Sequence, residues 1–413
     1  MSEPNARPEV PADLQRRYRT SGGPLPGAIR ETREDFEVEE LPLYTPSGSG
    51  EHVYAWVEKR GLPTPELVRR LSRRLHVPQR TIGYAGLKDA RAVTRQWVSF
   101  SGVRPEQLEG VEEEQFRVLQ VARHTNKLKL GHLRGNRFRL RVGGVAAHAD
   151  ALRAVLAELE AEGVPNYFGL QRFGRTRRTH LLGRALVQED AAAAIAELLE
   201  PPTEPAPWER EARAAVAARD YAQAAERFPK SASAERAVCR ALAGGADPEA
   251  ALAQVPLKLR RLYVSGFQSW LFNAYLSRRL ERMHLLETGE VATLHRNGAS
   301  FVVEDAAAEA PRAAAQEISA SGPLFGRKLL RPAPESAAWA LEAEVLAELA
   351  PGLGPELSDA FGAKPLGQRR PLRFQLSEPS LEVAGDDVWL SFVLPRGCYA
   401  TAVLEELLKR PVD

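Results

Sequence analysis

The sequence predicts an α+β protein in which both chain ends form one β-rich domain and a mainly helical domain is inserted between them. Two observations lead to this prediction. Residues 35–142 contain several segments in which apolar and polar residues alternate as in strands, whereas the chain from 164 to about 367 is rich in alanine and mostly helical in pattern. Strand character then returns at residues 388–394. With 413 residues, the chain is long enough for two domains.

In the first third, an apolar stripe at helical spacing follows Thr64, which predicts a helix with Thr64 as N-cap and Pro65 at the first helical position. A second stripe, from Leu152 to Leu159, predicts another helix. A turn is expected at residues 46–50 because they read Pro-Ser-Gly-Ser-Gly. Strands are expected at residues 35–39, 52–57, 96–100, 116–121 and 137–142.

In the second half, residues 306–315 are close to low complexity and are expected to form a mobile loop. A strand at 388–394 is followed by a helix at 401–409 that has Thr401 as its expected N-cap. Further helices are expected at 190–199, 209–227, 247–254 and 271–280. The predicted domains are therefore 1–163 with 368–413, of which 1–20 is expected to be a disordered leader, and the insert 164–367.

Composition argues against several classes of protein. No apolar run is long enough to span a bilayer, and residues 1–20 lack the apolar segment of a secretory signal. The two cysteines, Cys239 and Cys398, form no disulfide framework, and the eight histidines are scattered without HxH or HxxxH spacing. We therefore expect a cytoplasmic location and no metal site.

The basic residues are clustered although the net charge is only +2. No Asp or Glu occurs between Gln115 and Ala149, which indicates a face for a polyanion. The alternative is a set of solvated surfaces. The candidate RNA-binding residues are Arg123, Lys127, Lys129, Arg134, Arg172 and Arg175.

Residues 83–96 are the most suggestive stretch for catalysis. A lone carboxylate, Asp89, lies among Lys88, Arg91 and Arg95, and these cations favour its ionised form. Because no second carboxylate adjoins Asp89, the sequence does not favour hydrolysis by a pair of carboxylates. It favours a role for Asp89 as a nucleophile or as a base. The alternative is a turn Asp that caps a neighbouring backbone group.

Aromatic residues stand in three further stretches. Phe138 ends a basic segment and could stack on a base or belong to the core. Residues 166–175 combine aromatic residues, glycines and arginines, which suits either RNA or a packed domain junction. Tyr399 follows the strand at 388–394 and either faces a cleft or belongs to a capping turn.

Together these stretches resemble the TruD family of tRNA pseudouridine synthases. Residues 86–96 look like the family motif G-x-K-D-x-x-A-x-T-x-Q, and 124–138 look like H-x-x-K-L-x-x-G-x-x-x-G-N-x-F. Residues 165–174 look like P-N-Y-F-G-x-Q-R-F-G, 394–401 like L-P-x-G-S-[FY]-A-T, and 33–38 like P-x-D-F-x-V. The sequence departs from these motifs at two positions, where Arg33 replaces Pro and Cys398 replaces Ser.

The resemblance implies a V-shaped molecule that has a pseudouridine synthase catalytic domain, with a mixed sheet and helices, and an inserted family-specific domain. It implies uridine 13 of tRNA as substrate and neither cofactor nor metal. Asp89 matches the catalytic Asp, while Asn136, Phe138 and Tyr399 match residues that line the uracil pocket. Arg30 falls where the family has a basic partner for the Asp. We expect a monomer.

The residues leave the mechanism open. Asp89 could attack C1′ or C6, or remove a proton from C2′. Our hypothesis is that Phe138 and Tyr399 sandwich the flipped uracil, that Asn136 helps hold it, and that Lys88 or Arg30 keeps Asp89 ionised. Two competing functions are a non-catalytic RNA-binding or RNA-folding protein on the same scaffold and a hydrolytic enzyme, either nuclease or glycosidase.

Overall fold

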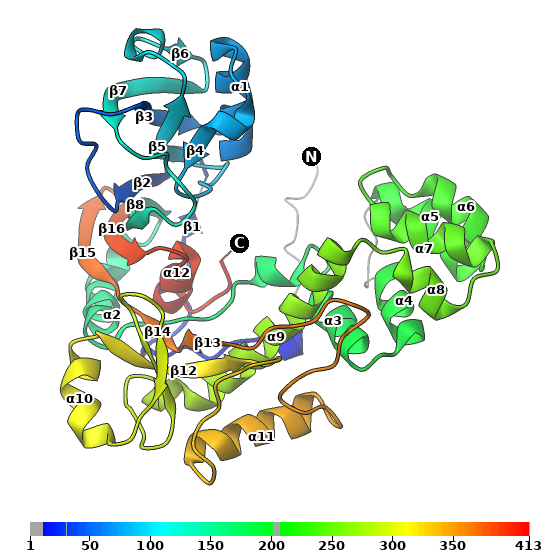
Figure 1. The fold of residues 1–413 in the computed structure, drawn as a ribbon. Helices are drawn as coiled ribbons and strands as arrows, with labels where there is room; N and C mark the ends of the chain where they lie inside the picture. The colour runs from blue at the N-terminus through cyan, green and yellow to red at the C-terminus, as the bar shows by residue number, and fades with distance from the viewer. Residues whose placement is uncertain (1–10, 30, 201–206, 413) are drawn as a thin grey trace. The chain divides into compact units, whose positions relative to one another are not determined.

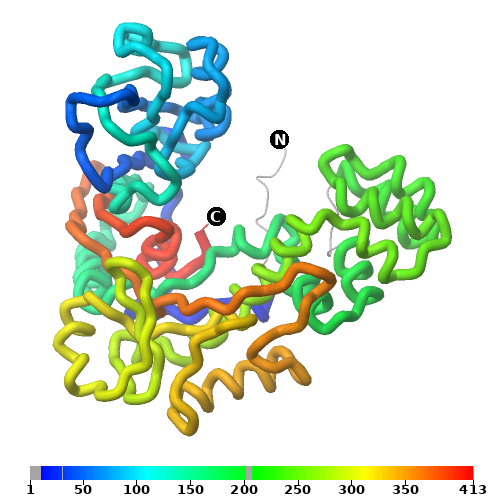
Figure 2. The backbone as a smooth tube through the Cα atoms, viewed as in Figure 1, coloured from blue at the N-terminus to red at the C-terminus, as the bar shows by residue number. Residues whose placement is uncertain are grey.

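The computed structural model describes residues 11–29, 31–200 and 207–412, which fall into two compact units (Figure 1). The sheet unit comprises residues 20–164 and 374–412, and the helical unit comprises 165–373 with the described residues 11–19. Figure 2 shows that the sheet unit is formed by segments from both ends of the chain, since blue to cyan segments lie beside red ones. The fold is mixed α and β, as the sequence predicts.

The sheet unit is built on a ten-stranded mixed sheet. Its strand order is β15-β16-β8-β2-β5-β3-β7-β6, with β1 beside β8 and β4 beside β5. Among the described strands of this sheet, only the pairing of β2 with β5 is parallel. The strands are β1 (Ala28–Ile29), β2 (Phe36–Pro42), β3 (His52–Arg60), β4 (Ile82–Tyr84), β5 (Val93–Ser101), β6 (Glu112–Glu113), β7 (Phe116–His124), β8 (Leu133–Gly143), β15 (Ser377–Ala384) and β16 (Asp387–Pro395).

Three helices cover one face of this sheet, namely α1 (Thr64–Leu75), α2 (Ala149–Glu162) and α12 (Ala400–Leu408). The core under α2 and α12 includes Val38 and Phe138, while the core under α1 includes Val57 and Phe116. The apolar stripe of α1 is buried, as its helical spacing requires. The loop that joins β4 to β5 contributes Ala92 to the core under α2 and α12. Short 3-10 helices occur at Gln79–Thr81, Pro105–Gln107 and Ala146–His148.

The helical unit is organised around the buried helix α9 (Leu257–Arg279). Helix α3 (Thr179–Val187) packs so closely on it that a Cβ at Gly183 would lie 2.1 Å from the carbonyl oxygen of Tyr263. The other helices are α4 (Ala191–Leu199), α5 (Arg210–Ala217), α6 (Tyr221–Arg227), α7 (Ser233–Ala243), α8 (Pro248–Ala253), α10 (Ala306–Ala314) and α11 (Ala337–Leu349). The unit also holds 3-10 turns at Ala12–Leu14, Leu170–Phe173, Pro207–Glu209 and Leu280–Arg282.

A four-stranded antiparallel sheet in the helical unit, ordered β11-β10-β12-β13, was not expected from the sequence. Its strands are β10 (Val291–Leu294), β11 (Ser300–Val302), β12 (Ile318–Leu324) and β13 (Gln368–Pro371). Two short strands, β9 (Val164–Pro165) and β14 (Arg373–Phe374), also pair with each other.

Several local predictions need correction. Residues 306–314 form helix α10 instead of a mobile loop, because Asp305 accepts hydrogen bonds from the first N–H groups of the helix. The expected helix at 209–227 is divided into α5 and α6, and Arg219 lies between them with a positive φ of 58°. Neither Thr64 nor Thr401 is an N-cap, since Pro63 and Tyr399 occupy those positions.

The expected disordered leader is also partly wrong. Leu14 is buried in the core of the helical unit. Asp13 bonds twice to that unit, because its carbonyl accepts a 2.8 Å hydrogen bond from Trp270 Nε1 and its carboxylate lies 2.7 Å from His180 Nε2. Residues 11–19 are therefore held by packing and hydrogen bonds. Residues 1–10 lie outside the described part of the chain.

None of the helices in the described part of the chain combines the length and apolar character needed to span a bilayer.

Candidate active site

Two rows of cross-strand neighbours run over the helix-covered face of the sheet. The first row contains, in spatial order, Phe392, Phe138, Val38, Thr94 and Lys59 on β16, β8, β2, β5 and β3. Two residues further along these strands, Leu394, Asn136 and Glu40 form the second row. Residues paired in this way have Cβ atoms about 4.5–5.5 Å apart on the same face. The sheet register therefore places Asn136 beside Glu40 and Thr94 beside Lys59.

The loop that carries Asp89 is fastened to this face by the residues around it. The Lys88 ammonium lies 2.7 Å from the Glu40 carboxylate, and the Lys88 backbone N–H donates to Thr64 Oγ1 at 3.0 Å. Thr64 in turn donates to Gln96 Oε1 at 2.9 Å, and Gln96 Nε2 donates to the Gly86 carbonyl at 3.4 Å. Thr64 and Gln96 are both fully buried. The loop is thereby anchored on both sides of Asp89.

Asp89 itself is exposed. Its Oδ1 accepts a hydrogen bond from the Arg91 backbone N–H at 3.0 Å, which is the turn interaction that the sequence left open as an alternative. This bond orients the carboxylate at the surface of the loop. A turn role and a chemical role are therefore compatible in this geometry.

A lysine that the sequence did not single out lies beneath the loop. Lys59 is fully buried, and its ammonium donates to the carbonyls of Leu62 at 2.6 Å and Asp89 at 3.1 Å, with the Lys88 carbonyl at 3.5 Å. Burial lowers the pKa of Lys59 to about 8, while the charge of Asp89 acts in the opposite direction.

The role expected for Lys88 requires revision. Its buried ammonium forms an ion pair with the Glu40 carboxylate. Burial raises the pKa of Glu40, although the charge of Lys88 acts in the opposite direction. Lys59 also interacts electrostatically with Asp89. Arg30, the other expected partner of Asp89, lies outside the described residues.

The three residues expected to line a base pocket differ in exposure. Phe138 is only 7% exposed and packs against Phe36 and Phe392 at centroid distances of 6.1 and 5.8 Å, so it belongs to the core. Tyr399 is 53% exposed at the start of α12, where its ring is available for stacking. Asn136 Oδ1 is buried without a hydrogen-bond partner among the described residues. A buried polar atom of this kind is expected to find a partner.

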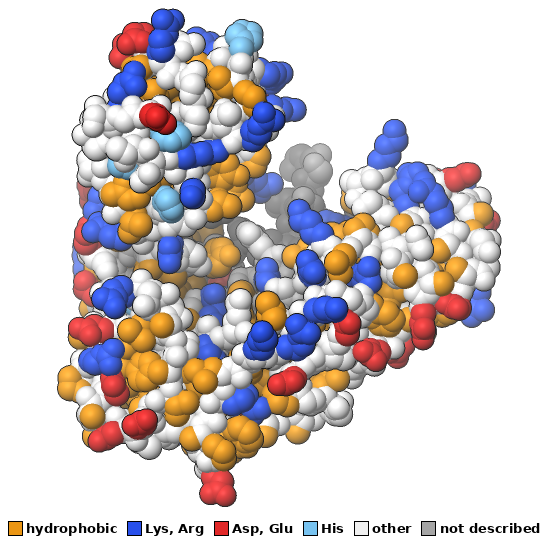
Figure 3. Space-filling model, viewed as in Figure 1, with side chains coloured by type: hydrophobic (Ala, Val, Ile, Leu, Met, Phe, Trp, Pro, Cys, Tyr) orange, Lys and Arg blue, Asp and Glu red, His pale blue; other side chains and the backbone are white. Residues whose placement is uncertain are grey.

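The candidate RNA-binding residues fall into two groups. In the sheet unit, Arg123, Lys129 and Arg134 are exposed, and Lys127 reaches the Arg80 carbonyl. Figure 3 shows Lys, Arg and His side chains interspersed with hydrophobic ones on the visible face of this unit. Such a mixture suits contacts with phosphates and bases.

The other two candidates, in the helical unit, serve internal contacts. Arg172 donates to the hydroxyls of Ser265 and Ser269, and Arg175 forms a 2.6 Å ion pair with the buried Glu209. The first contact joins the 3-10 turn at Leu170–Phe173 to α9, and the second joins the following loop to the 3-10 turn at Pro207–Glu209. Arg172 is half-buried, whereas 53% of the Arg175 side chain stays exposed beside its ion pair.

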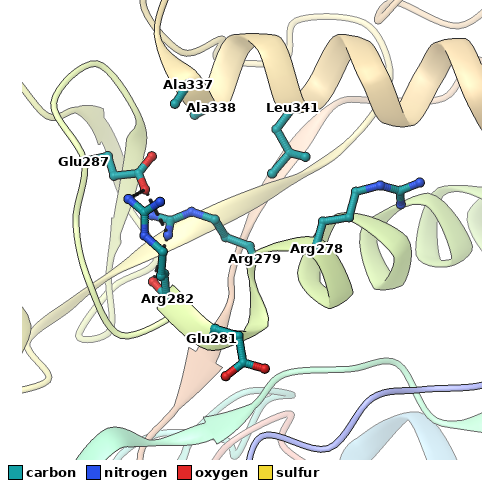
Figure 4. Close-up of a pocket in the computed structure, with 8 residues that line it drawn as sticks. All are labelled: Arg278, Arg279, Glu281, Arg282, Glu287, Ala337, Ala338 and Leu341. Carbon is teal, nitrogen blue, oxygen red and sulfur yellow. Dashed lines mark hydrogen bonds and ion pairs between the residues drawn. The ribbon is translucent and has the colours of Figure 1, made fainter.

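A cavity of about 170 Å³ in the helical unit is lined by Arg278, Arg279 and Arg282 (Figure 4). Each arginine pairs with a glutamate: Arg279 lies 3.2 Å from Glu287, Arg282 contacts the same carboxylate, and Arg278 lies 2.5 Å from Glu348. The positive charge of this cavity is therefore already balanced. Within the described residues, no group of three His, Cys, Asp or Glu side chains is placed to hold a metal ion.

Known proteins match the chain over almost its whole length. The family model described as tRNA pseudouridine synthase D (TruD) matches residues 15–407. A protein named tRNA pseudouridine synthase D from Geobacter metallireducens is 46% identical over 401 residues, which cover 96% of this chain and 98% of the relative. One of the same name from Geotalea daltonii is 45% identical over 399 residues, with 95% and 99% coverage.

The fold also matches a solved structure. A crystal structure of a Methanosarcina mazei protein described as a tRNA pseudouridine synthase D (TruD) is similar, with a TM-score of 0.81 and 28% sequence identity. The similarity covers 95% of this chain and 96% of the other. Both units therefore lie within the matched region.

Proposed function

Because the chain belongs to the TruD family of tRNA pseudouridine synthases, we propose that it isomerises uridine 13 of tRNA to pseudouridine, with Asp89 as the catalytic carboxylate. The observation that carries the proposal is the setting of Asp89. It is an exposed carboxylate on a loop fastened by Thr64, Gln96 and Lys59, next to the row that contains Asn136. A fixed scaffold below an exposed reactive group is the arrangement that catalysis requires.

The reaction breaks N1–C1′ and forms C5–C1′ in the same nucleotide. The proton leaves C5, and N1 of the turned uracil carries a proton in the product, so no oxidant, reductant or energy source is consumed. Asp89 acts as a nucleophile at C1′ or C6, or as a base at C2′. All three roles require the ionised carboxylate, and each is compatible with its exposed position on the loop.

The target uracil has to leave its stack, which costs a few kcal/mol. We propose that Tyr399 offers the stacking surface that offsets this cost and that the Asn136 amide binds the base by a hydrogen bond. Phe138 supports the site from the core, since only 7% of it is exposed. Tyr399→Phe keeps the ring and should retain activity. Tyr399→Ala should weaken binding of the flipped base by about 1–3 kcal/mol.

Phosphate contacts are assigned to Arg123, Lys127, Lys129 and Arg134 of the sheet unit, and the helical unit adds further contacts through Arg172 and Arg175. These contacts steer and hold the tRNA without reading its sequence. We further propose that the protein acts as a monomer in the cytoplasm. Cys239 is a buried free thiol in the structure, which fits a reducing compartment.

The test uses tRNA transcripts, the wild-type protein in EDTA, and chemical mapping of pseudouridine. Conversion at position 13, none in a transcript with cytidine at that position, and none by Asp89→Asn with unchanged RNA affinity would support the proposal. Tight binding without conversion of any transcript would favour the RNA-binding protein instead. Release of free uracil would favour a glycosidase.

A further inference from the structure

Lys59 occupies a position where a charged side chain is costly. It continues the inward-facing side of β3, after Val53, Ala55 and Val57, and none of these four residues has measurable exposure. Removing an ammonium from water costs several kcal/mol unless strong partners replace the lost hydration. An apolar residue at this position would avoid that cost. The groups that surround the Lys59 ammonium must therefore account for the presence of a charge at this position.

Those neighbours belong to the Asp89 loop. An ammonium has three N–H donors, and the three hydrogen bonds from Lys59 go to backbone carbonyls, two of which belong to Lys88 and Asp89. These bonds hold the two successive peptide groups that determine the direction of the Asp89 side chain. The Thr64 hydroxyl adds a fourth contact, because it accepts a hydrogen bond from the Lys88 N–H.

The charged groups that face Lys59 come from the same loop. Asp89 attracts its ammonium, and Lys88 repels it while being held by Glu40. Its cross-strand neighbours on β5 and β7 are the uncharged residues Thr94 and Phe116. Thr64 and Leu67 present the uncharged face of α1. The adjacent β3 residues Glu58 and Arg60 have the opposite alternation and lie on the other side of the sheet.

We propose that Lys59 is a positioning residue for catalysis, which fixes the backbone that presents Asp89 and places a positive charge near its carboxylate. The inference rests on the proposed function of Asp89. It predicts that Lys59 acts on turnover and on the pH dependence of turnover, and that RNA affinity is left unchanged, because the buried ammonium does not reach the surface.

The experiment measures single-turnover rates of Lys59→Met across pH, beside wild type and Asp89→Asn. Methionine fills similar space without charge. We expect the maximal rate to fall roughly 10- to 100-fold, the size expected when hydrogen bonds from a charged group are lost. The acidic limb of the pH–rate profile should move to higher pH, because a carboxylate is protonated more readily when a nearby cation is removed. RNA affinity should stay within a factor of two or so.

Lys409→Met is the matched control. Lys409 is another buried lysine of the sheet unit, and its ammonium donates to Glu406 at 3.4 Å and to the Thr20 hydroxyl, away from the Asp89 loop. Its replacement should lower the melting temperature without moving the pH–rate profile. Lys59→Arg retains the charge and should restore part of the rate and the wild-type acidic limb. It also keeps the test open if Lys59→Met fails to fold.

Three outcomes separate the possibilities. If Lys59→Met folds and retains the wild-type rate and profile, Lys59 has no positioning role. If it loses activity only in proportion to its lost stability, as the control does, its role is structural and the inference is also overturned. If Asp89→Asn is fully active, the proposed function itself fails, whatever Lys59→Met shows.

Discussion

Thr64→Val tests the anchoring of the catalytic loop most sharply, because the two side chains have nearly the same shape. The wild-type hydroxyl accepts from the Lys88 N–H at 3.0 Å and donates to Gln96 Oε1 at 2.9 Å. Valine removes both hydrogen bonds and leaves a buried donor and a buried acceptor without a partner. Each costs about 1–3 kcal/mol, so the closed loop should lose about 2–6 kcal/mol relative to its open form.

This loss can be measured by native-state hydrogen exchange at the Lys88 amide. Since about 1.4 kcal/mol corresponds to a factor of ten, exchange should accelerate roughly 30- to 10⁴-fold, up to the limit set by global unfolding. Single-turnover pseudouridine formation should fall roughly 10- to 100-fold, because small displacements of a reacting group are costly. Thr64→Ser keeps the hydroxyl and serves as control. Wild-type exchange and turnover in the Val variant would refute the anchoring role.

Three further predictions concern other interactions of the sheet unit. Glu40→Gln leaves the buried Lys88 ammonium without its carboxylate partner and should destabilise the unit by about 3–5 kcal/mol in denaturant titrations. Adding Lys88→Met should recover most of this loss. If the effects of the two substitutions are additive instead, the pairing of Glu40 with Lys88 is contradicted. The Arg141 guanidinium holds the pKa of Asp35 at about 2, below its unfolded value of ~3.9. The stabilisation from this ion pair is therefore complete above pH ~4 and is lost as pH falls toward 2. The melting temperature of the wild type should fall over this pH range, and that of Asp35→Asn should not show this contribution. Lys129→Ala should reduce the salt dependence of tRNA binding by about one unit in a log–log plot, and an unchanged slope would remove Lys129 from the phosphate contacts.

Six of the ten strands of the large sheet could be predicted from their apolar and alternating patterns, whereas β1, β4, β6 and β15 were missed. The alternation at residues 388–394, for example, corresponds to strict alternation of buried and half-buried residues in β16. The four-stranded sheet of the helical unit was missed because β10 and β11 are only four and three residues long and show no such alternation in burial. Short strands of that kind depend on their partners more than on local sequence.

The sequence was sufficient to locate the candidate site but not to identify all the residues that form it. Motif residues identified the Asp89 loop and Tyr399, whose exposure suits their expected roles. Lys59 was overlooked, although it stands on the inward-facing side of its strand, because lysine at a strand end ordinarily faces water. Its burial depends on the Asp89 loop and on α1, which no local pattern reveals. For the same reason the sequence could not show that Lys88 pairs with Glu40.

The most direct test of the central claim follows the hydrogen that the reaction must remove. Forming C5–C1′ displaces the hydrogen on C5, so tRNA that carries tritium at C5 of its uridines should release tritium to water. The account predicts release equivalent to one uridine per tRNA by the wild type, and none by Asp89→Ala at saturating RNA with unchanged affinity. Release by Asp89→Ala at the wild-type rate would contradict the assignment of Asp89 as the catalytic carboxylate.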